Sequence, residues 1–191
     1  NGVVSGKRVF YIYEGRQAEE ELNSDEELPE LMVVEDTLRI KKQVLVFYAT
    51  KRNAESGATR ISALVSGKLT EEEKKKLAEL SESVMNVLQR PTEQCKKLAA
   101  LVAKGVAFHH AGLLNEQRWL IEEAFRRGLI KAICSTTTLA LGINTPAHTV
   151  LVKDTSRYSN GYGSERLGVN EVLQLFGRAG RPSYDKEGRA L

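Results

Sequence analysis

The sequence QVLVFYATKRNAESGATRISAL, residues 43–64, joins a buried strand directly to a helix. Its first part, Gln43–Tyr48, is an almost continuous apolar run, which is typical of a strand that is covered on both faces. Thr50 then stands where a helix N-cap is needed, because a threonine hydroxyl can accept a hydrogen bond from a free N–H group of the first turn. The helix is predicted over 51–64. Strands buried on both faces occur mainly in parallel sheets, so this stretch favours an α/β fold.

The same alternation of short apolar runs and longer amphipathic stretches continues outward along the chain. Strands separated by helices of this length predict a doubly wound, mostly parallel sheet with helices on both faces. Residues 16–27 are acidic and weakly patterned, and we expect a loop or a loose helix there. Trp119 and Phe125 are expected in the core. Further strands are predicted over 7–13, 106–108, 129–134 and 149–153, and further helices over 28–40, 70–88, 92–105, 115–127 (with Asn115 as its N-cap) and 170–177.

Composition excludes several classes of protein. The chain has 191 residues, of which 41% are hydrophobic, and this is enough for a packed core and argues against disorder. No stretch approaches the roughly 20 apolar residues of a membrane-spanning helix. Cys95 and Cys134 lie far apart and outside any Cys-x-x-Cys pattern, so we expect neither a disulfide nor a zinc site, and a cytoplasmic, reducing compartment. Because the chain opens on Asn1 and ends at Leu191 at the start of a predicted strand, we expect a piece of a longer protein, truncated at the C-terminus.

Charge is distributed unevenly along the chain. Residues 1–40 hold four basic and ten acidic side chains, whereas residues 41–191 hold 24 basic and 15 acidic ones. An excess of basic side chains favours a polyanion such as nucleic acid, although a solvated basic surface explains it as well. We expect residues 1–40 to be a leading segment, with a first strand and helix, that packs on a domain formed by residues 41–191.

The most specific segment is QLFGRAGRP, residues 174–182. Two glycines permit a tight backbone path, and Arg178 and Arg181 follow the end of a predicted helix. Guanidinium groups stay charged and bind phosphate oxygens with two parallel hydrogen bonds. The whole pattern therefore indicates a phosphate-binding element rather than an ordinary glycine-rich loop.

Polar segments follow three of the predicted strands. They are YATKR (48–52), AFHHAGL (107–113) and STTTLALGINTPA (135–147). Because the carboxyl ends of parallel strands meet at one edge of a sheet, these segments should converge on a single binding face. His109 and His110 have no further ligands in a recognisable arrangement, so no metal site is expected.

These segments, in this order, resemble the second RecA-like motor domain of superfamily 2 helicases. The resemblance covers residues 41–189 and is strongest to the superkiller-type (Ski-like) branch and its archaeal DNA helicases of stalled replication forks. VLVFYATKRNAE matches motif IV of the family, STTTLALGINTPA matches motif V and QLFGRAGRP matches motif VI. The resemblance implies a RecA-like domain 2 that acts in an ATP-dependent, 3′-to-5′ DNA helicase. ATP with Mg²⁺ would be shared with a first RecA-like domain of the same polypeptide.

The resemblance also implies roles for individual residues. In motif VI, Arg178 and Arg181 match arginines that reach the ATP phosphates, and Gln174 matches a residue that links nucleotide and nucleic-acid binding. In motif V, Gly142 and Asn144 match positions near the nucleotide. The residues that match contacts to the backbone of single-stranded or forked DNA are Thr50, Lys51, Arg52, His110, Gly112, Thr136 and Thr138.

The interval at about 154–168 matches a β-hairpin that, in similar archaeal helicases, wedges into the duplex junction. Tyr158 and Tyr162 would stack on bases, and Arg157 would hold a phosphate. A plain glycine-rich surface loop is the alternative for this interval.

Part of an ATPase site has no counterpart in these residues. Neither a phosphate-cradling Gly-x-x-x-x-Gly-Lys-[Ser/Thr] loop nor an acidic magnesium ligand motif occurs, so we expect no turnover by these residues alone. Two alternatives stay open. One is an RNA helicase of the same branch, because a grip on phosphates does not distinguish ribose from deoxyribose. The other is a non-catalytic nucleic-acid-binding module with a RecA-like fold.

Overall fold

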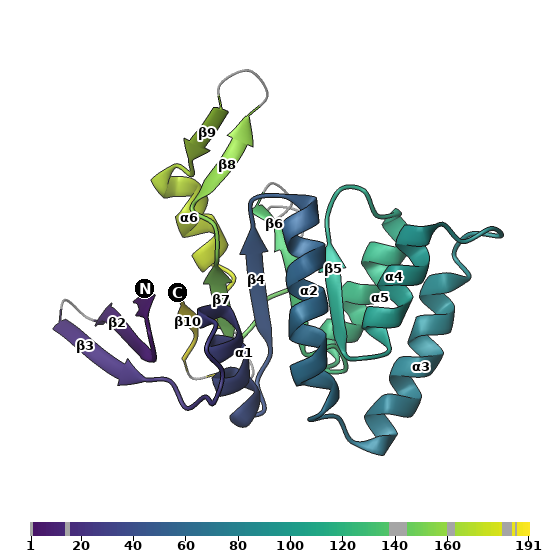
Figure 1. The fold of residues 1–191 in the computed structure, drawn as a ribbon, viewed down its shortest axis with the longest axis horizontal. Coiled ribbons are helices and arrows are strands. Elements are labelled where there is room, and N and C mark those ends of the chain that lie inside the picture. Colours follow the sequence, from purple (N-terminus) through teal and green to yellow (C-terminus); the bar gives the residue numbers. More distant parts are fainter. Residues whose placement is uncertain (1, 14–15, 138–144, 160–162, 181–184, 186) are drawn as a thin grey trace.

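A five-stranded parallel sheet forms the centre of the molecule (Figure 1). The computed structural model describes residues 2–13, 16–137, 145–159, 163–180, 185 and 187–191. The strand order is β10-β7-β4-β6-β5, and every pairing is parallel, which confirms the predicted α/β fold. The strands are β4 (Val44–Tyr48), β5 (Val106–His109), β6 (Ala132–Thr136), β7 (Thr149–Val152) and β10 (Arg189–Ala190).

Helices cover this sheet. α2 packs on β4, β5 and β6, and α4 packs on β5. The connection from β4 to β5 and the connection from β5 to β6 cross the sheet in opposite directions, so right-handed crossovers put α5 on the face opposite α2. The described helices are α1 (Pro29–Arg39), α2 (Lys51–Ser66), α3 (Glu71–Met85), α4 (Glu93–Val102), α5 (Asn115–Arg126) and α6 (Val169–Phe176).

Threonine side chains cap three helices, and the cap at Thr50 confirms the prediction. The hydroxyls of Thr50, Thr70 and Thr92 each accept a hydrogen bond from the backbone N–H three residues later. The start of α5 differs from the prediction: Leu114 occupies the N-cap position, and Asn115 is already helical. The side chain of Gln117 accepts from the backbone N–H of Leu114 at 3.4 Å, so one N–H group at this end is satisfied without an N-cap side chain.

The first residues form a separate antiparallel sheet, which lies at the left of Figure 1. Its strands are β1 (Gly2–Ser5), β2 (Arg8–Tyr13) and β3 (Arg16–Glu21). The prediction of a loop or loose helix was therefore wrong for residues 16–21. Pairing with β2 gives this acidic stretch its hydrogen-bond partners, and Arg8 contacts Glu19 across the strands at 2.8 Å. On the sheet's other side, Arg189 of β10 forms ion pairs with Glu20 of β3 and Asp36 of α1.

Two other predictions need correction. Trp119 is 59% exposed rather than in the core, because it lies on the outer side of α5, whereas Phe125 is fully buried as predicted. The strand predicted over 129–134 is observed at Ala132–Thr136, because Gly128 adopts a φ of +75° and the chain turns before pairing begins.

The interval between β7 and α6 is a hairpin, as predicted. β8 (Ser156–Ser159) pairs with β9 (Gly163–Arg166) in antiparallel register, and the pair stands clear of the main sheet in Figure 1. The backbone N–H of Leu167 donates to the carbonyl of Thr155 at 2.8 Å and closes the base of the hairpin.

Candidate nucleotide and nucleic-acid interface

The predicted polar segments lie together at the carboxyl edge of the sheet. β4, β5, β6 and β7 are parallel, so the residues that follow them lie at one edge. In an open α/β sheet this edge is where ligands bind, especially where neighbouring connections diverge. The divergence here lies between β4 and β7, because the chain leaves β4 toward β5 but leaves β7 toward β10.

The turn after β4 presents two cations at a helix start. Thr50 accepts a hydrogen bond from the N–H of Asn53 at 3.1 Å and so fixes the beginning of α2. Lys51 and Arg52 occupy the first turn and are exposed. The free N–H groups and the positive end of the helix dipole favour an anion there, and the two side chains add charge of the same sign.

His110 lies in the interior and not at the surface. Its ring is 1% exposed and stacks on Phe108 with ring centroids 5.2 Å apart. Nδ1 accepts a hydrogen bond from the N–H of Gly112 at 3.1 Å, so Nε2 carries the proton and donates to Glu55 at 3.2 Å. Burial lowers the pKa of His110, which favours the neutral ring. The buried ring of His110 therefore does not present the phosphate contact that was predicted at this position.

The exposed Gly112 is held by its neighbours. Its carbonyl accepts a hydrogen bond from the side chain of Gln94 on α4 at 2.9 Å. A Cβ placed on Gly112 would lie 3.0 Å from Nδ1 of His110 and 3.5 Å from Nζ of Lys51. The loop backbone and the lysine of the neighbouring turn therefore lie together, as the sequence predicts for two segments at one edge.

Glu55 joins the two helices behind this loop. One carboxylate oxygen accepts from His110, and the other contacts Nζ of Lys97 at 2.7 Å. Burial alone would raise the pKa of Glu55, but hydrogen bonds from Lys97 and His110 outweigh burial and lower it. Glu55 and Gln94 were missed by the sequence reasoning, because no local pattern marks a side chain that acts through tertiary contacts.

The arginine-bearing loop after α6 is hydrogen-bonded to Ala147, the last residue of the motif V segment. Ala147 donates its N–H to the carbonyl of Arg178 at 2.9 Å and accepts from the N–H of Gly180 at 2.7 Å. Gly180 has a φ of +89°, a conformation that glycine adopts without strain. Gln174 is exposed on the last turn of α6, and Arg178 is half-buried. The backbone on which Arg178 stands is therefore fixed from both sides.

Several predicted site residues are not placed by the structure. Gly142, Asn144, Thr138, Tyr162 and Arg181 lie outside the described residues. The backbone of Arg157 and Tyr158 belongs to β8, but their side chains lie outside the described part. Thr136 is the last residue of β6 and is buried.

Within the described residues, no group of three or more His, Cys, Asp or Glu side chains is arranged to hold a metal ion. Cys95 and Cys134 are both free thiols. No helix in the described ranges has the length and apolarity needed to cross a bilayer.

The family profile of the helicase conserved C-terminal domain matches residues 78–183. The chain belongs to this helicase family. The ATP-dependent DNA helicase Hel308 of Pyrococcus horikoshii is 46% identical over 172 residues, which cover 90% of this chain and 22% of that protein. Hel308 of Methanocella arvoryzae is 40% identical over 194 residues, covering the whole chain and 25% of that protein. Hel308 of Pyrococcus abyssi is 44% identical over 188 residues, or 97% of this chain.

These relatives place the helicase C-terminal domain close to archaeal Hel308 and account for the RecA-like sheet. The chain spans about a quarter of the length of the curated relatives that it matches. The family profile includes α5, the motif V segment and the whole motif VI segment, whereas Thr50, Lys51 and Arg52 lie outside it.

Proposed function

We propose that this chain is the second motor domain of an ATP-dependent DNA helicase. ATP with Mg²⁺ binds between this domain and a first RecA-like domain of the same polypeptide, and Gly142 and Asn144 border the nucleotide. Arg178 and Arg181 supply positive charge to the phosphates as the bond to the terminal phosphate breaks. An arginine in this role raises the rate of phosphoryl transfer by about 10³–10⁵-fold in known cases.

The observation that supports this most strongly is the pair of backbone hydrogen bonds between Ala147 and the motif VI loop. An arginine that stabilises a transition state must be held in place before the reaction, because its contribution depends on preorganisation. The backbone hydrogen bonds at Arg178 and Gly180 hold the loop in place in this way, whereas a surface loop without a catalytic role does not need to be held. Gln174 stands one helical turn earlier and links this site to the nucleic acid.

The nucleic-acid side of the proposal rests on the carboxyl edge of the sheet. Lys51 and Arg52, together with Thr138, would bind phosphates of one DNA strand, which fixes position without reading sequence. The β8–β9 hairpin would separate the duplex, with Tyr158 and Tyr162 stacking on bases and Arg157 on a phosphate. Movement would run from 3′ to 5′ along the bound strand.

The experiment uses the intact helicase with Arg178→Ala or Arg181→Ala, and Arg126→Ala as the control, because Arg126 is an exposed arginine of α5 that pairs with Glu123. We expect each motif VI variant to lose at least about 10³-fold in DNA-stimulated ATP hydrolysis while its affinity for single-stranded DNA changes little. The control should match the unmodified protein. Intact ATP hydrolysis in both motif VI variants would favour the non-catalytic module instead.

Substrate and direction need separate measurements. Unwinding of forked DNA is compared with unwinding of an RNA duplex of the same sequence, and 3′-tailed DNA is compared with 5′-tailed DNA. Preference for the RNA duplex would replace the DNA helicase with the RNA-directed alternative, and preference for 5′ tails would reverse the proposed direction.

A further inference from the structure

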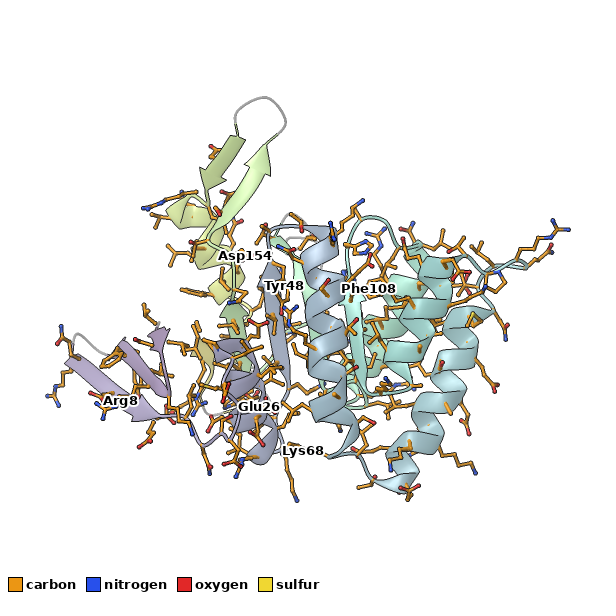
Figure 2. All side chains as sticks on the ribbon, in the orientation of Figure 1. Arg8, Glu26, Tyr48, Lys68, Phe108 and Asp154 are labelled. Carbon is orange, nitrogen blue, oxygen red and sulfur yellow. The ribbon has the colours of Figure 1, made fainter. Side chains whose placement is uncertain are left out.

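The base of the β8–β9 hairpin is hydrogen-bonded to the end of β4. The N–H of Lys153 donates to the carbonyl of Phe47 at 2.9 Å, which continues the pairing of β7 with β4 by one residue. One residue later, Oδ2 of Asp154 accepts a hydrogen bond from the N–H of Ala49 at 3.0 Å. Figure 2 shows Asp154 at the base of the hairpin, above Tyr48 at the end of β4.

The residue that Asp154 holds begins the cationic turn. Ala49 precedes Thr50, the N-cap of α2, and the exposed Lys51 and Arg52 follow it. A single carboxylate thus joins two segments that are distant in sequence. One is the hairpin, to which the proposed function assigns strand separation, and the other is the turn to which it assigns the grip on a DNA strand.

A second contact stabilises the same segment from the side. Nζ of Lys153 lies 3.1 Å from Glu30 of α1, and the other carboxylate oxygen of Glu30 accepts two hydrogen bonds from Arg60 of α2 at 2.7 and 3.0 Å. The Glu30 side chain is only 4% exposed, and its carboxylate is shared by two cations that are themselves partly exposed, Lys153 at 37% and Arg60 at 42%. It anchors residue 153 firmly, and the direction in which the chain then leaves depends on residue 154.

We propose that Asp154 is a positioning residue that fixes the direction of the hairpin relative to the cationic turn after β4. This inference rests on the proposed function. Because β4 and β7 pair in one sheet, the turn and the base of the hairpin move together, and the hydrogen bond from Ala49 sets the angle at which the hairpin meets the duplex junction. Without the carboxylate, the N–H of Ala49 loses its partner and the hairpin can pivot at its base.

The test compares three variants of the intact helicase. Asp154→Ala removes the acceptor, whereas Asp154→Asn keeps a side-chain carbonyl oxygen that can accept the same hydrogen bond. Thr155→Ala is the matched control, because the Thr155 side chain is exposed and its backbone carbonyl, which accepts from Leu167, is unchanged. Two quantities are measured, namely ATP hydrolysis stimulated by single-stranded DNA and the number of base pairs unwound per ATP on a forked substrate.

We expect Asp154→Ala to keep its ATP hydrolysis within about twofold and to lose about tenfold in base pairs unwound per ATP, as a factor of ten corresponds to the loss of one well-placed hydrogen bond. Asp154→Asn should recover most of this loss, and Thr155→Ala should show none. Normal yield of unwinding in Asp154→Ala would overturn the proposal. So would equal losses in Asp154→Ala and Asp154→Asn, or equal losses of hydrolysis and unwinding.

Hydrogen exchange separates this proposal from the helicase assignment. In the intact protein, the amide of Ala49 should exchange faster in Asp154→Ala than in the unmodified protein and in Asp154→Asn. If the unmodified protein neither hydrolyses ATP nor unwinds DNA, the proposed function fails even though the exchange result holds. If the unmodified protein unwinds DNA but the Ala49 amide exchanges equally in all variants, only the role of Asp154 is refuted.

Discussion

Gly57 of α2 faces the ring of Tyr48, and this contact predicts a large effect of adding one methyl group. A Cβ at residue 57 would lie 2.2 Å from the hydroxyl oxygen of Tyr48 and 2.3 Å from Cζ. Carbon atoms in contact lie about 3.5–4.0 Å apart, so the ring would have to move by more than 1 Å. Tyr48 is 2% exposed and ends the central strand β4, so its ring is enclosed by the core.

The magnitude follows from two opposing terms. Overpacking of a filled core costs about 1–3 kcal/mol, and the closeness of this contact puts Gly57→Ala at the upper end. Replacing glycine by alanine inside a helix returns about 1 kcal/mol of helix propensity. The net loss in the free energy of unfolding is therefore about 2 kcal/mol, which lowers Tm by roughly 4–8 °C in a chain of this size.

The assay is thermal unfolding followed by circular dichroism, with Gly67→Ala as the matched control. Gly67 ends the same helix with a φ of −69°, and its added Cβ would meet nothing closer than 3.8 Å. Because alanine reduces the entropy of the unfolded chain, this control should gain about 0.4–1 kcal/mol. A Gly57→Ala protein that melts at or above the temperature of the control would refute the argument from the Tyr48 contact.

Three further changes test other parts of the structure. Burial opposes ionisation of Glu35, but hydrogen bonds from Asp25, Ser24 and Lys68 lower its pKa to about 2, below the ordinary 4.5. The stabilisation of the folded state by the ionised carboxylate is therefore complete above pH 4.5 and is lost as the pH falls toward 2. Glu35→Gln should lower the free energy of unfolding by roughly 1–3 kcal/mol at pH 7 in urea unfolding, and equal losses at pH 7 and pH 2 would contradict this. Burial lowers the pKa of His110 below 6.5, so the unfolded chain takes up a proton before the folded protein does, and the free energy of unfolding falls as the pH drops through 6.5. In His110→Gln, the urea concentration at the midpoint of unfolding should therefore depend less on pH between about pH 7.5 and 5.5 than in the unmodified protein. Trp119→Ala should change Tm by no more than about 2 °C, because the side chain is 59% exposed, and a drop as large as that of Gly57→Ala would show that this surface is packed.

Local signals in the sequence predicted most of the main sheet and its helices. In the run Gln43–Tyr48, residues 44–48 are apolar and buried on both faces, which is typical of a strand in the middle of a covered sheet. Thr50, Thr70 and Thr92 mark helix starts because the bond that each hydroxyl makes spans three residues. The hairpin between β7 and α6 was also predictable, since turn-forming residues separate its two short strands.

The features that the sequence did not reveal depend on distant partners. β3 is an acidic strand that forms because β2 supplies a ladder of hydrogen bonds. His110 was predicted at a phosphate-binding surface, but contacts with Glu55 and Phe108 keep its ring inside, while the exposed backbone of Gly112 keeps the loop at the predicted edge. Nothing near Trp119 in the sequence says which side of α5 is covered. In each case the residue that determines the structure is too distant in sequence to affect the local hydrophobic pattern.

The closed base of the hairpin has a consequence for engineering and for divergence among relatives. Asp154 holds one side of the base to the sheet, and the bond from Leu167 to Thr155 joins the two sides. Beyond this base, the side chains that the structure describes, those of Ser156, Glu165 and Arg166, are not part of the core. Segments that begin and end at a common closed base tolerate changes of length and composition well. The hairpin is therefore an exchangeable insertion in a constant domain. A longer, shorter or differently charged hairpin can be placed between residues 155 and 167 without redesign of the rest of the domain.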